Sequence, residues 1–165
     1  MVYLKAGEMH FSDTPTMVIT VLGSCLSITM YSRRKGLGAI CHGLLPQCGG
    51  QKRCDGGCLE GFKYVDCSIR KMGKLFDRHG VKRSELEVKV FGGADMFSRQ
   101  IRIPGIVSVG KQNVQTAETI IVSEGFKVRE ADVGGMRGRK IFFYTDTGEV
   151  YLKRLTKANR AELAR

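Results

Sequence analysis

Apolar and polar residues alternate along several stretches of the chain in the way that is typical of half-buried strands. The alternation is clearest at residues 86–90, where Leu, Val and Val alternate with Glu and Lys. Shorter apolar runs are bounded by Gly, Asp and Ser, which favour turns. An apolar run occupies residues 19–22. After it, the pattern predicts strands at residues 26–31, 36–41, 86–90, 126–133, 139–145 and 149–155. Turns are expected at 32–35 and 146–148, and a tight hairpin connection at 134–138.

Two segments have the period of an amphipathic helix instead. In the first, Asp66 is a candidate N-cap, residues 69, 72 and 76 share an apolar face, and Gly80 ends the helix. His79 falls in the last turn, where it suits a helix end better than a metal site. In the second, Asn113 is a candidate N-cap and Gly125 stops a helix that buries residues 114, 117, 120 and 121.

The order of these elements indicates the fold class. Strands outnumber helices and cluster in hairpins, and no alternation of strand and helix dominates. We therefore expect an α+β domain with a layered, mostly antiparallel sheet. With 165 residues, 18.3 kDa and 42% hydrophobic residues, the chain is long enough to bury a core without disulfides. Residues 1–155 are expected to form a single domain, followed by a charged C-terminal tail at 156–165.

Charge limits the classes of partner. Lys and Arg number 27 against 16 Asp and Glu, for a formal net charge of +11. Such an excess occurs in nucleic-acid-binding proteins, but here the basic residues are scattered and no helix-turn-helix, zinc-finger or RNA-binding motif is present. We expect no nucleic-acid partner. A basic surface would equally steer the protein toward an acidic helical bundle.

The N-terminal residues do not combine a charged region with an apolar core, and no apolar run approaches about 18 residues. The protein is therefore expected in the cytoplasm and without membrane insertion. We also expect it to be a monomer when it is free. Its six cysteines should be mostly reduced there.

Cys25 and His42 flank one predicted hairpin and are the candidate nucleophile and base. If the turn occupies residues 32–35, pairing outward from it places Cys25 directly opposite His42. Opposed residues have Cβ atoms about 4.5–5.5 Å apart, from which a thiol and an imidazole can hydrogen-bond. Cys41 alternates to the other face and is expected to point away.

The residues around Cys25 suit nucleophilic chemistry. A thiolate is favoured by a neighbouring imidazolium or by backbone N–H groups, which lower the pKa of a cysteine. Gly23 and Ser24 could supply such N–H groups, and the same donors would face an oxyanion in acyl transfer. Thr20 is a candidate to orient the imidazole through its hydroxyl or its carbonyl. The alternative is that Cys25 is a buried core thiol, and the pattern alone leaves both open.

Residues 47–61 are rich in glycine and lack periodicity. They contain Cys48, Cys54 and Cys58, which raises the possibility of zinc, but the C-x2-C spacing is absent and a fourth ligand would have to come from elsewhere. We favour a mobile surface loop with spare thiols and expect no metal site. Gly134 and Gly135 are not a phosphate cradle, because no Gly-Lys-Ser/Thr follows them.

Five motifs occur in order between about residues 3 and 153. They are Thr-x-Leu-Gly-Ser-Cys at 20–25, His-x-Leu-Leu-Pro at 42–46, Lys-Val-Phe-Gly-Gly-Ala-Asp-Met-Phe at 89–97, Asn113, and Asp-Val-Gly-Gly at 132–135 with Gly-Arg-Lys at 138–140. In this combination the chain resembles the chemoreceptor glutamine deamidase family, CheD. The resemblance implies a Cys-His-Thr site, with the nucleophile on Cys25, the base on His42 and the third member on Thr20. The assignment of Thr20 is supported because its two sequence neighbours are apolar and have no hydroxyl.

The resemblance also implies the reaction and the partners. The side-chain amide of selected receptor glutamines would be hydrolysed to glutamate through a cysteine thioester, with ammonia released and no metal or organic cofactor, in chemotaxis adaptation. It further implies sheets with helices packed outside, similar to the catalytic domains of deamidating toxins, and association with a CheC-type phosphatase. A substrate or partner rim is expected beside the active-site mouth, at Phe91, Gly92, Gly93, Met96 and Phe97.

Two other classes of function stay open. The chain could serve mainly as a regulatory binding partner of a CheC-type phosphatase, with weak or no catalysis. It could also be a different thiol hydrolase or a nucleic-acid binder built on a zinc loop. Because Cys25 and His42 are both intact, the sequence favours the enzyme.

Overall fold

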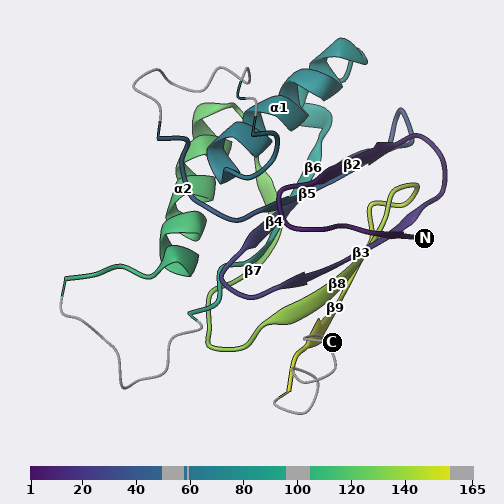
Figure 1. Ribbon diagram of the computed structural model, residues 1–165. Coiled ribbons are helices and arrows are strands. Elements are labelled where there is room, and N and C mark those ends of the chain that lie inside the picture. The colour runs from purple at the N-terminus through teal and green to yellow at the C-terminus, as the bar shows by residue number, and fades with distance from the viewer. Residues whose placement is uncertain (50–57, 59, 96–104, 157–165) are drawn as a thin grey trace.

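The computed structural model describes residues 1–49, 58, 60–95 and 105–156. Within them nine strands form two sheets, and the chain also contains two α-helices and a single 3-10 turn (Figure 1). The elements are β1 Val2–Tyr3, β2 Met9–Ser12, β3 Met17–Leu22, β4 Leu26–Ser32, β5 Leu37–Gly43, α1 Val65–Arg78, η1 Arg83–Glu85, β6 Glu87–Gly92, α2 Val109–Ser123, β7 Val128–Val133, β8 Arg139–Tyr144 and β9 Val150–Arg154.

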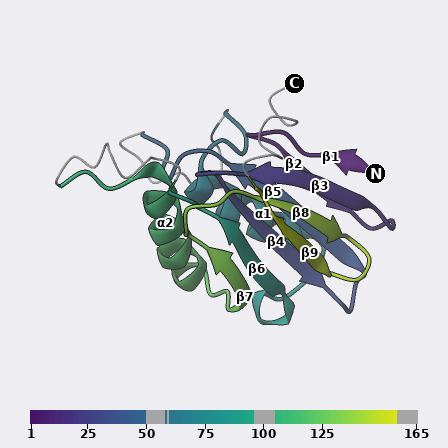
Figure 2. The same cartoon turned by 90° about the horizontal axis from the view of Figure 1, so that it is seen from below.

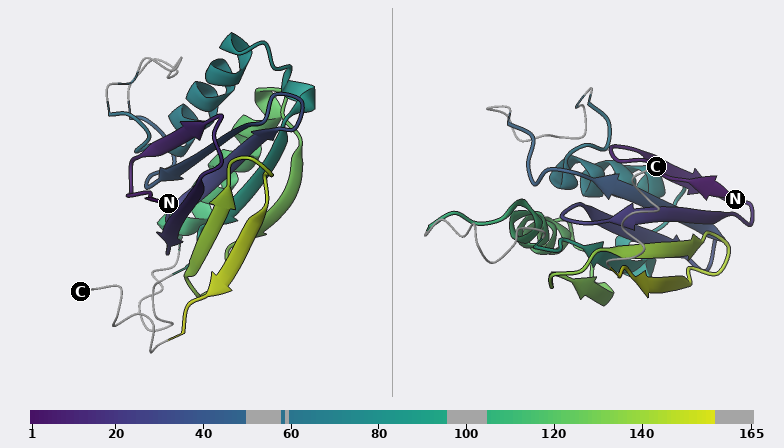
Figure 3. Two further views of the ribbon diagram at one scale, coloured as in Figure 1. Left: turned by 90° about the vertical axis from the view of Figure 1, so that its right-hand side faces the viewer. Right: turned by 60° about the horizontal axis from the view of Figure 1, so that its bottom comes forward.

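The strands are arranged in layers. One sheet has the order β1-β3-β8-β9 and the other β2-β5-β4-β6-β7. The five-stranded sheet lies in the middle, with both helices on one face and the four-stranded sheet on the other (Figures 2 and 3). Most neighbours are antiparallel, but β1 with β3 and β6 with β7 are parallel. The expected α+β fold with helices outside layered sheets is confirmed, with mixed rather than uniformly antiparallel sheets.

Alternation along β4 decides which side chains face which layer. Leu26, Ile28 and Met30 belong to the core between the sheet and the helices. Ile40 of β5 belongs to the second core, between the two sheets. Because successive side chains of a strand point to opposite faces, His42 lies on the same inter-sheet face as Ile40.

The β4–β5 hairpin differs from the predicted register. Ser27 pairs with His42 and Ser32 with Leu37, so the turn occupies 33–36 rather than 32–35. Gly36 has a φ of +61°, a left-handed conformation that glycine adopts without strain, which explains why it belongs to the turn and not to the strand. The pairing moves by two residues, so Cys25 and His42 keep their common face but are not directly opposite.

Both helices begin elsewhere than predicted. In α1 the N-cap is Tyr64, and Asp66 is the second helical residue. In α2 the N-cap is Ser108, whose side chain accepts a hydrogen bond from the Lys111 N–H at 3.4 Å. Asn113 lies inside α2 and is buried. Asp and Asn are common capping residues, but here tertiary contacts use both side chains inside the helix.

The predicted tight hairpin at 134–138 is wrong. β7 pairs in parallel with β6 in the five-stranded sheet, whereas β8 pairs with β3 in the other sheet. The segment therefore carries the chain from one sheet to the other. The 146–148 turn between β8 and β9 is confirmed as an antiparallel hairpin, as are the strand at 86–90 and the position of His79 at the end of α1.

The described helices include none with the length and apolar character needed to cross a membrane. The predicted charged tail falls outside the described residues, apart from Thr156.

Candidate active site

Cys25 lies in the short turn that connects β3 of one sheet to β4 of the other. Three consecutive carbonyl groups of this turn are held by hydrogen bonds. The Gly23 carbonyl accepts from the Ala94 N–H at 2.9 Å, and the Cys25 carbonyl accepts from the Gly93 N–H at 2.8 Å. The Ser24 carbonyl accepts from the side-chain amide of Asn113 at 2.9 Å. The backbone that carries the candidate nucleophile is thus fixed on one side.

The same contacts orient the N–H groups of the turn. In a trans peptide the N–H points opposite to the preceding carbonyl, and all described peptide bonds are trans. The N–H groups of Ser24 and Cys25 therefore point away from Ala94 and Asn113. The backbone N–H of Cys25 acts on its own sulfur, since it favours a lower pKa of that thiol. This is the placement expected of donors that stabilise charge at the reacting centre.

Glycine is required where β6 approaches this turn. Gly92 has a φ of +117°, and a Cβ there would overlap the Cys25 carbonyl oxygen. Gly93 has a φ of +65°, and a Cβ there would overlap the Val114 side chain. The two glycines predicted to lie beside the site do lie against the Cys25 turn.

Phe91 does not belong to an exposed rim. Its side chain is 2% exposed and packs in the core between the two sheets. It pairs with Ser27 of β4, so alternation places it inside the sandwich. Met96 and Phe97 lie outside the described residues. Of the predicted rim, only Gly92 and Gly93 are seen beside the turn.

His42 and Thr20 come from different sheets and meet between them. The Thr20 hydroxyl lies 2.7 Å from Nδ1 of His42 and donates its proton to the Leu4 carbonyl at 2.8 Å. A hydroxyl has one proton, so Nδ1–H of His42 is the donor to Thr20. The other ring nitrogen, Nε2, is then unprotonated and free to accept a proton. Nε2 is buried and has no hydrogen-bond partner within the described residues.

Cys25 shares the inter-sheet face with His42. Its side chain packs against the core between the sheets. Continuing the β4–β5 pairing one step past Leu26 and Gly43 puts Cys25 opposite Leu44 and diagonal to His42. Diagonal neighbours have Cα atoms about 7–8 Å apart and Cβ atoms somewhat closer. Cys41 lies on the opposite face, in the core beneath the helices, as predicted.

Burial sets the protonation of both groups. It raises the pKa of the Cys25 thiol, and the backbone N–H of Cys25 opposes that shift only in part. Burial lowers the pKa of His42, while the nearby Leu4 carbonyl and the charge of Glu8 act in the other direction. The expected lowering of the thiol pKa is therefore not seen. At neutral pH the pair is a thiol and a neutral imidazole, which is the state in which a base can accept the thiol proton.

Asn113 is a site residue that the sequence interpretation missed, because it was assigned to a helix cap. Its amide nitrogen also donates to the Leu44 carbonyl at 3.0 Å, two residues after His42. One buried side chain thus ties the Cys25 turn to the end of β5. The signal was present in the sequence: Asn113 is four residues before Ala117 on the apolar face of the helix, where a polar side chain needs partners.

The Asp132 and Arg139 motif residues connect the two sheets near this turn. Arg139 is fully buried, pairs with Leu22 at the end of β3, and forms an ion pair with Asp132 at 2.6 Å. Its guanidinium also donates to the Asp132 and Gly134 carbonyls. A buried guanidinium requires such partners. The residues of this motif therefore have a structural role, which is to provide hydrogen-bond acceptors for Arg139.

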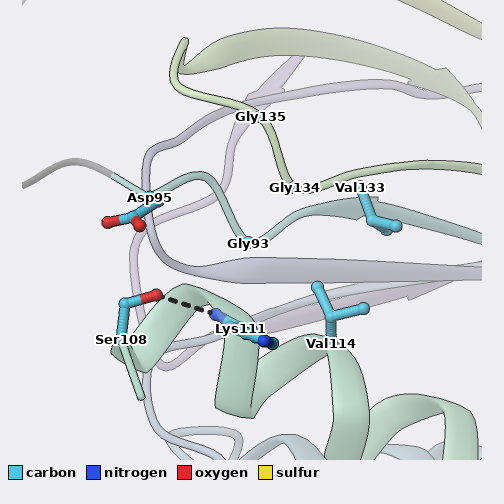
Figure 4. A pocket seen from close by; sticks show the side chains of 8 residues that line it. All are labelled: Gly93, Asp95, Ser108, Lys111, Val114, Val133, Gly134 and Gly135. Carbon is cyan, nitrogen blue, oxygen red and sulfur yellow. Dashed lines mark hydrogen bonds between the residues drawn. The ribbon is translucent and has the colours of Figure 1, made fainter. Parts of the chain in front are cut away.

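A pocket of about 210 Å³ lies beside the Cys25 turn, between the start of α2 and the ends of β6 and β7 (Figure 4). Gly93 belongs both to its wall and to the contact with Cys25. Val114 and Val133 point toward one another across it, and Asp95 lies at one end (Figure 4). Its surface is mostly apolar, and it reaches the Cys25 turn through Gly93 without including the Cys25 or His42 side chain in its lining.

A family model described as CheD chemotactic sensory transduction matches residues 44–154, more than half of the chain. The chain belongs to the CheD family. Curated relatives support this at high coverage. The Geobacter sulfurreducens protein named probable chemoreceptor glutamine deamidase CheD 2 is 49% identical over 94% of this chain and 91% of its own length.

Two further CheD relatives carry the name probable chemoreceptor glutamine deamidase CheD. The one from Maridesulfovibrio salexigens is 41% identical over 94% of this chain and 92% of its own length. The one from Oleidesulfovibrio alaskensis is 39% identical over 95% of this chain and 74% of its own. Among solved structures, the hypothetical protein YfiH of Bacillus licheniformis matches with a TM-score of 0.49 and 12% identity, over 75% of this chain and 49% of that one.

Proposed function

We propose that this CheD-family protein hydrolyses the side-chain amides of selected chemoreceptor glutamines to glutamates and releases ammonia. The names of its relatives support the substrate. The observation that carries the proposal is the Thr20–His42 hydrogen bond, which leaves Nε2 of a buried, neutral histidine unprotonated on the face shared with Cys25. A thiol with an oriented base is the arrangement that nucleophilic acyl transfer requires.

The first half of the reaction forms a thioester. Nε2 of His42 takes the Cys25 proton while the sulfur attacks the amide carbon of the glutamine side chain. The negative charge that develops on the amide oxygen is stabilised by the N–H groups of Ser24 and Cys25. His42 then gives its proton to the leaving nitrogen, and ammonia departs.

The second half regenerates the enzyme. Water loses a proton to Nε2 of His42 as it attacks the thioester carbon, and the tetrahedral intermediate expels the Cys25 sulfur. That sulfur recovers the proton from His42, leaving glutamate on the receptor. Thr20 keeps the ring oriented throughout by accepting from Nδ1–H. No step requires a group other than this chain, the receptor and water.

The partners follow from the same surface. A glutamine projecting from a receptor helix needs a shallow groove near the site. The mostly apolar pocket between α2 and the ends of β6 and β7, which meets the Cys25 turn through Gly93, is the surface that we assign to the rest of that helix. A CheC-type phosphatase that presents a receptor-like helix would occupy the same place. The two would then compete, and the chain would be monomeric when neither is bound.

The test is peptide mapping of receptor cytoplasmic fragments by mass spectrometry after incubation with the protein. Conversion of glutamine to glutamate adds about 1 Da, and Cys25→Ala should slow it by at least about 1,000-fold. The matched control is Cys41→Ala, which removes a thiol from the helix side of the sheet and should leave most activity. Full activity in Cys25→Ala would refute the site. Deamidation unchanged at saturating phosphatase would refute the shared surface.

A further inference from the structure

Three cysteines outside the active site come together at the start of α1. The sulfur atoms of Cys48, Cys58 and Cys67 all lie within 4.8 Å of one another. The sulfurs of Cys48 and Cys58 are 3.7 Å apart. Two thiolates bound tetrahedrally at about 2.3 Å from one zinc ion have sulfurs about 3.8 Å apart. The Cys48–Cys58 spacing is therefore that of sulfurs sharing a zinc ion, and the Cys67 sulfur lies within 4.8 Å of both.

The chain fixes the backbone around each of these cysteines. One carboxylate oxygen of Asp66 accepts from the Cys48 N–H at 3.2 Å and from the Cys67 N–H at 2.7 Å. The ammonium of Lys71 donates to the Cys58 carbonyl at 2.6 Å. Asp66, Cys67 and Lys71 all belong to the first two turns of α1. Supporting hydrogen bonds of this kind position the ligands of metal sites.

The surroundings favour negative sulfur. Cys67 is the third residue of α1, near the positive end of the helix dipole, and the Lys71 ammonium adds a positive charge one turn further along. Zinc binds thiolates rather than thiols, and each ligating thiol loses its proton on binding. A cluster of thiolates is therefore less costly here than on a neutral surface.

We propose that Cys48, Cys58 and Cys67 form a structural zinc site that fastens the segment after β5 to the start of α1. The base of this segment is already closed, since the Leu44 N–H donates to the Lys63 carbonyl and the Val65 N–H to the Leu45 carbonyl, both at 2.8 Å. A water or a further side chain completes the tetrahedron. The ligand that the sequence interpretation lacked is Cys67, which lies in the helix and not in the Gly-rich loop.

The site requires the reduced chain. Cys48 and Cys58 carry thiols, whereas Cys67 is disulfide-bonded in the structure. A thiol reductant supplies two electrons and two protons, converts that disulfide to two thiols, and becomes a disulfide itself. Zinc then displaces the protons of the ligating thiols. In a reducing compartment the thiol form is the stable one.

The test is the metal content of the full-length protein after reduction, incubation with zinc chloride and removal of unbound zinc. Plasma mass spectrometry should find about one zinc per chain in the wild type and less than about 0.2 in Cys58→Ser. Cobalt chloride in place of zinc should give a thiolate-to-cobalt charge-transfer band and the intense visible bands of tetrahedral cobalt, both absent from Cys58→Ser. Cys25→Ala is the matched control and should retain both signals.

Cys58 is only partly buried, outside any helix or strand, so its serine variant should fold. Circular dichroism checks this, and Cys48→Ser repeats the test at a second ligand. Reduced wild type that retains less than about 0.2 zinc per chain would overturn the proposal, as would zinc content and cobalt spectra unchanged in Cys58→Ser. Neither readout depends on deamidation, so a failure here leaves the proposed function untouched.

Discussion

Replacing Asn113 by alanine tests how the Cys25 turn is held in place. The Asn113 side chain is buried and donates to the Ser24 and Leu44 carbonyls at 2.9 and 3.0 Å. Both acceptor residues are only partly buried, so losing the donor costs about 1 kcal/mol at each carbonyl. With the small cavity left behind, we expect a loss of about 2–3 kcal/mol in the free energy of unfolding. A domain of ordinary stability remains folded after such a loss.

The effect on catalysis should exceed the effect on folding. Without Asn113 the turn is free to shift, and a displacement on the order of 1 Å at a reacting atom costs about 100-fold in rate. We expect kcat/KM for receptor deamidation to fall about 10- to 100-fold in Asn113→Ala, measured beside urea unfolding. Gln115→Ala, exposed on the same helix, is the control and should change neither quantity. A folded, destabilised Asn113→Ala with unchanged kcat/KM would refute the positioning role.

The remaining predictions concern the reacting groups and the buried ion pair. His42→Ala should lower kcat/KM by at least about 1,000-fold, and adding Cys25→Ser should cause little further loss, because residues acting in one step are not additive. Thr20→Val should cost less, about 10- to 100-fold, because Thr20 orients the base. Since burial lowers the pKa of His42, the acidic limb of the kcat/KM profile should lie below pH 6.5, about the ordinary histidine value. Asp132→Asn should lower the free energy of unfolding by about 3 kcal/mol, because Arg139 keeps its charge in a buried position.

If the losses from Cys25→Ser and His42→Ala multiplied in the double variant, the two residues would act in separate steps. An acidic limb above pH 6.5 would mean that the environment stabilises the imidazolium, the opposite sign to the one stated. Glu130→Gln, on an exposed residue of β7, is the control for Asp132→Asn, and equal stability of the two would contradict the buried-charge argument.

The elements that depend on local periodicity and turn residues could be predicted from the sequence. The strand at 86–90, the β8–β9 hairpin and the apolar faces of both helices follow from periodicity and turn residues alone. The starts of the helices were misplaced because Asn113 is a good cap in isolation, and only its contacts with Ser24 and Leu44 explain its place inside α2. The switch of sheets between β7 and β8 was missed because strand pairing is a long-range property.

The candidate site was predictable to different depths. The face shared by Cys25 and His42 followed from strand alternation, and a register error of two residues did not disturb it. The contact of Thr20 with His42 joins two sheets, and no spacing along the chain encodes how sheets stack. Cys67 was overlooked because its proximity to Cys48 and Cys58 is a property of the folded chain, and no spacing motif in the sequence indicates it.

The central claim is that Cys25 forms a thioester with the receptor glutamine, and trapping that thioester tests it most directly. Hydroxylamine added during the reaction should compete with water and convert part of the modified glutamine to a glutamyl hydroxamate, identified by peptide mass spectrometry. We predict hydroxamate and glutamate at the same positions with the wild type, and neither with Cys25→Ala. Glutamate formed without any hydroxamate, or hydroxamate formed equally by Cys25→Ala, would contradict the account.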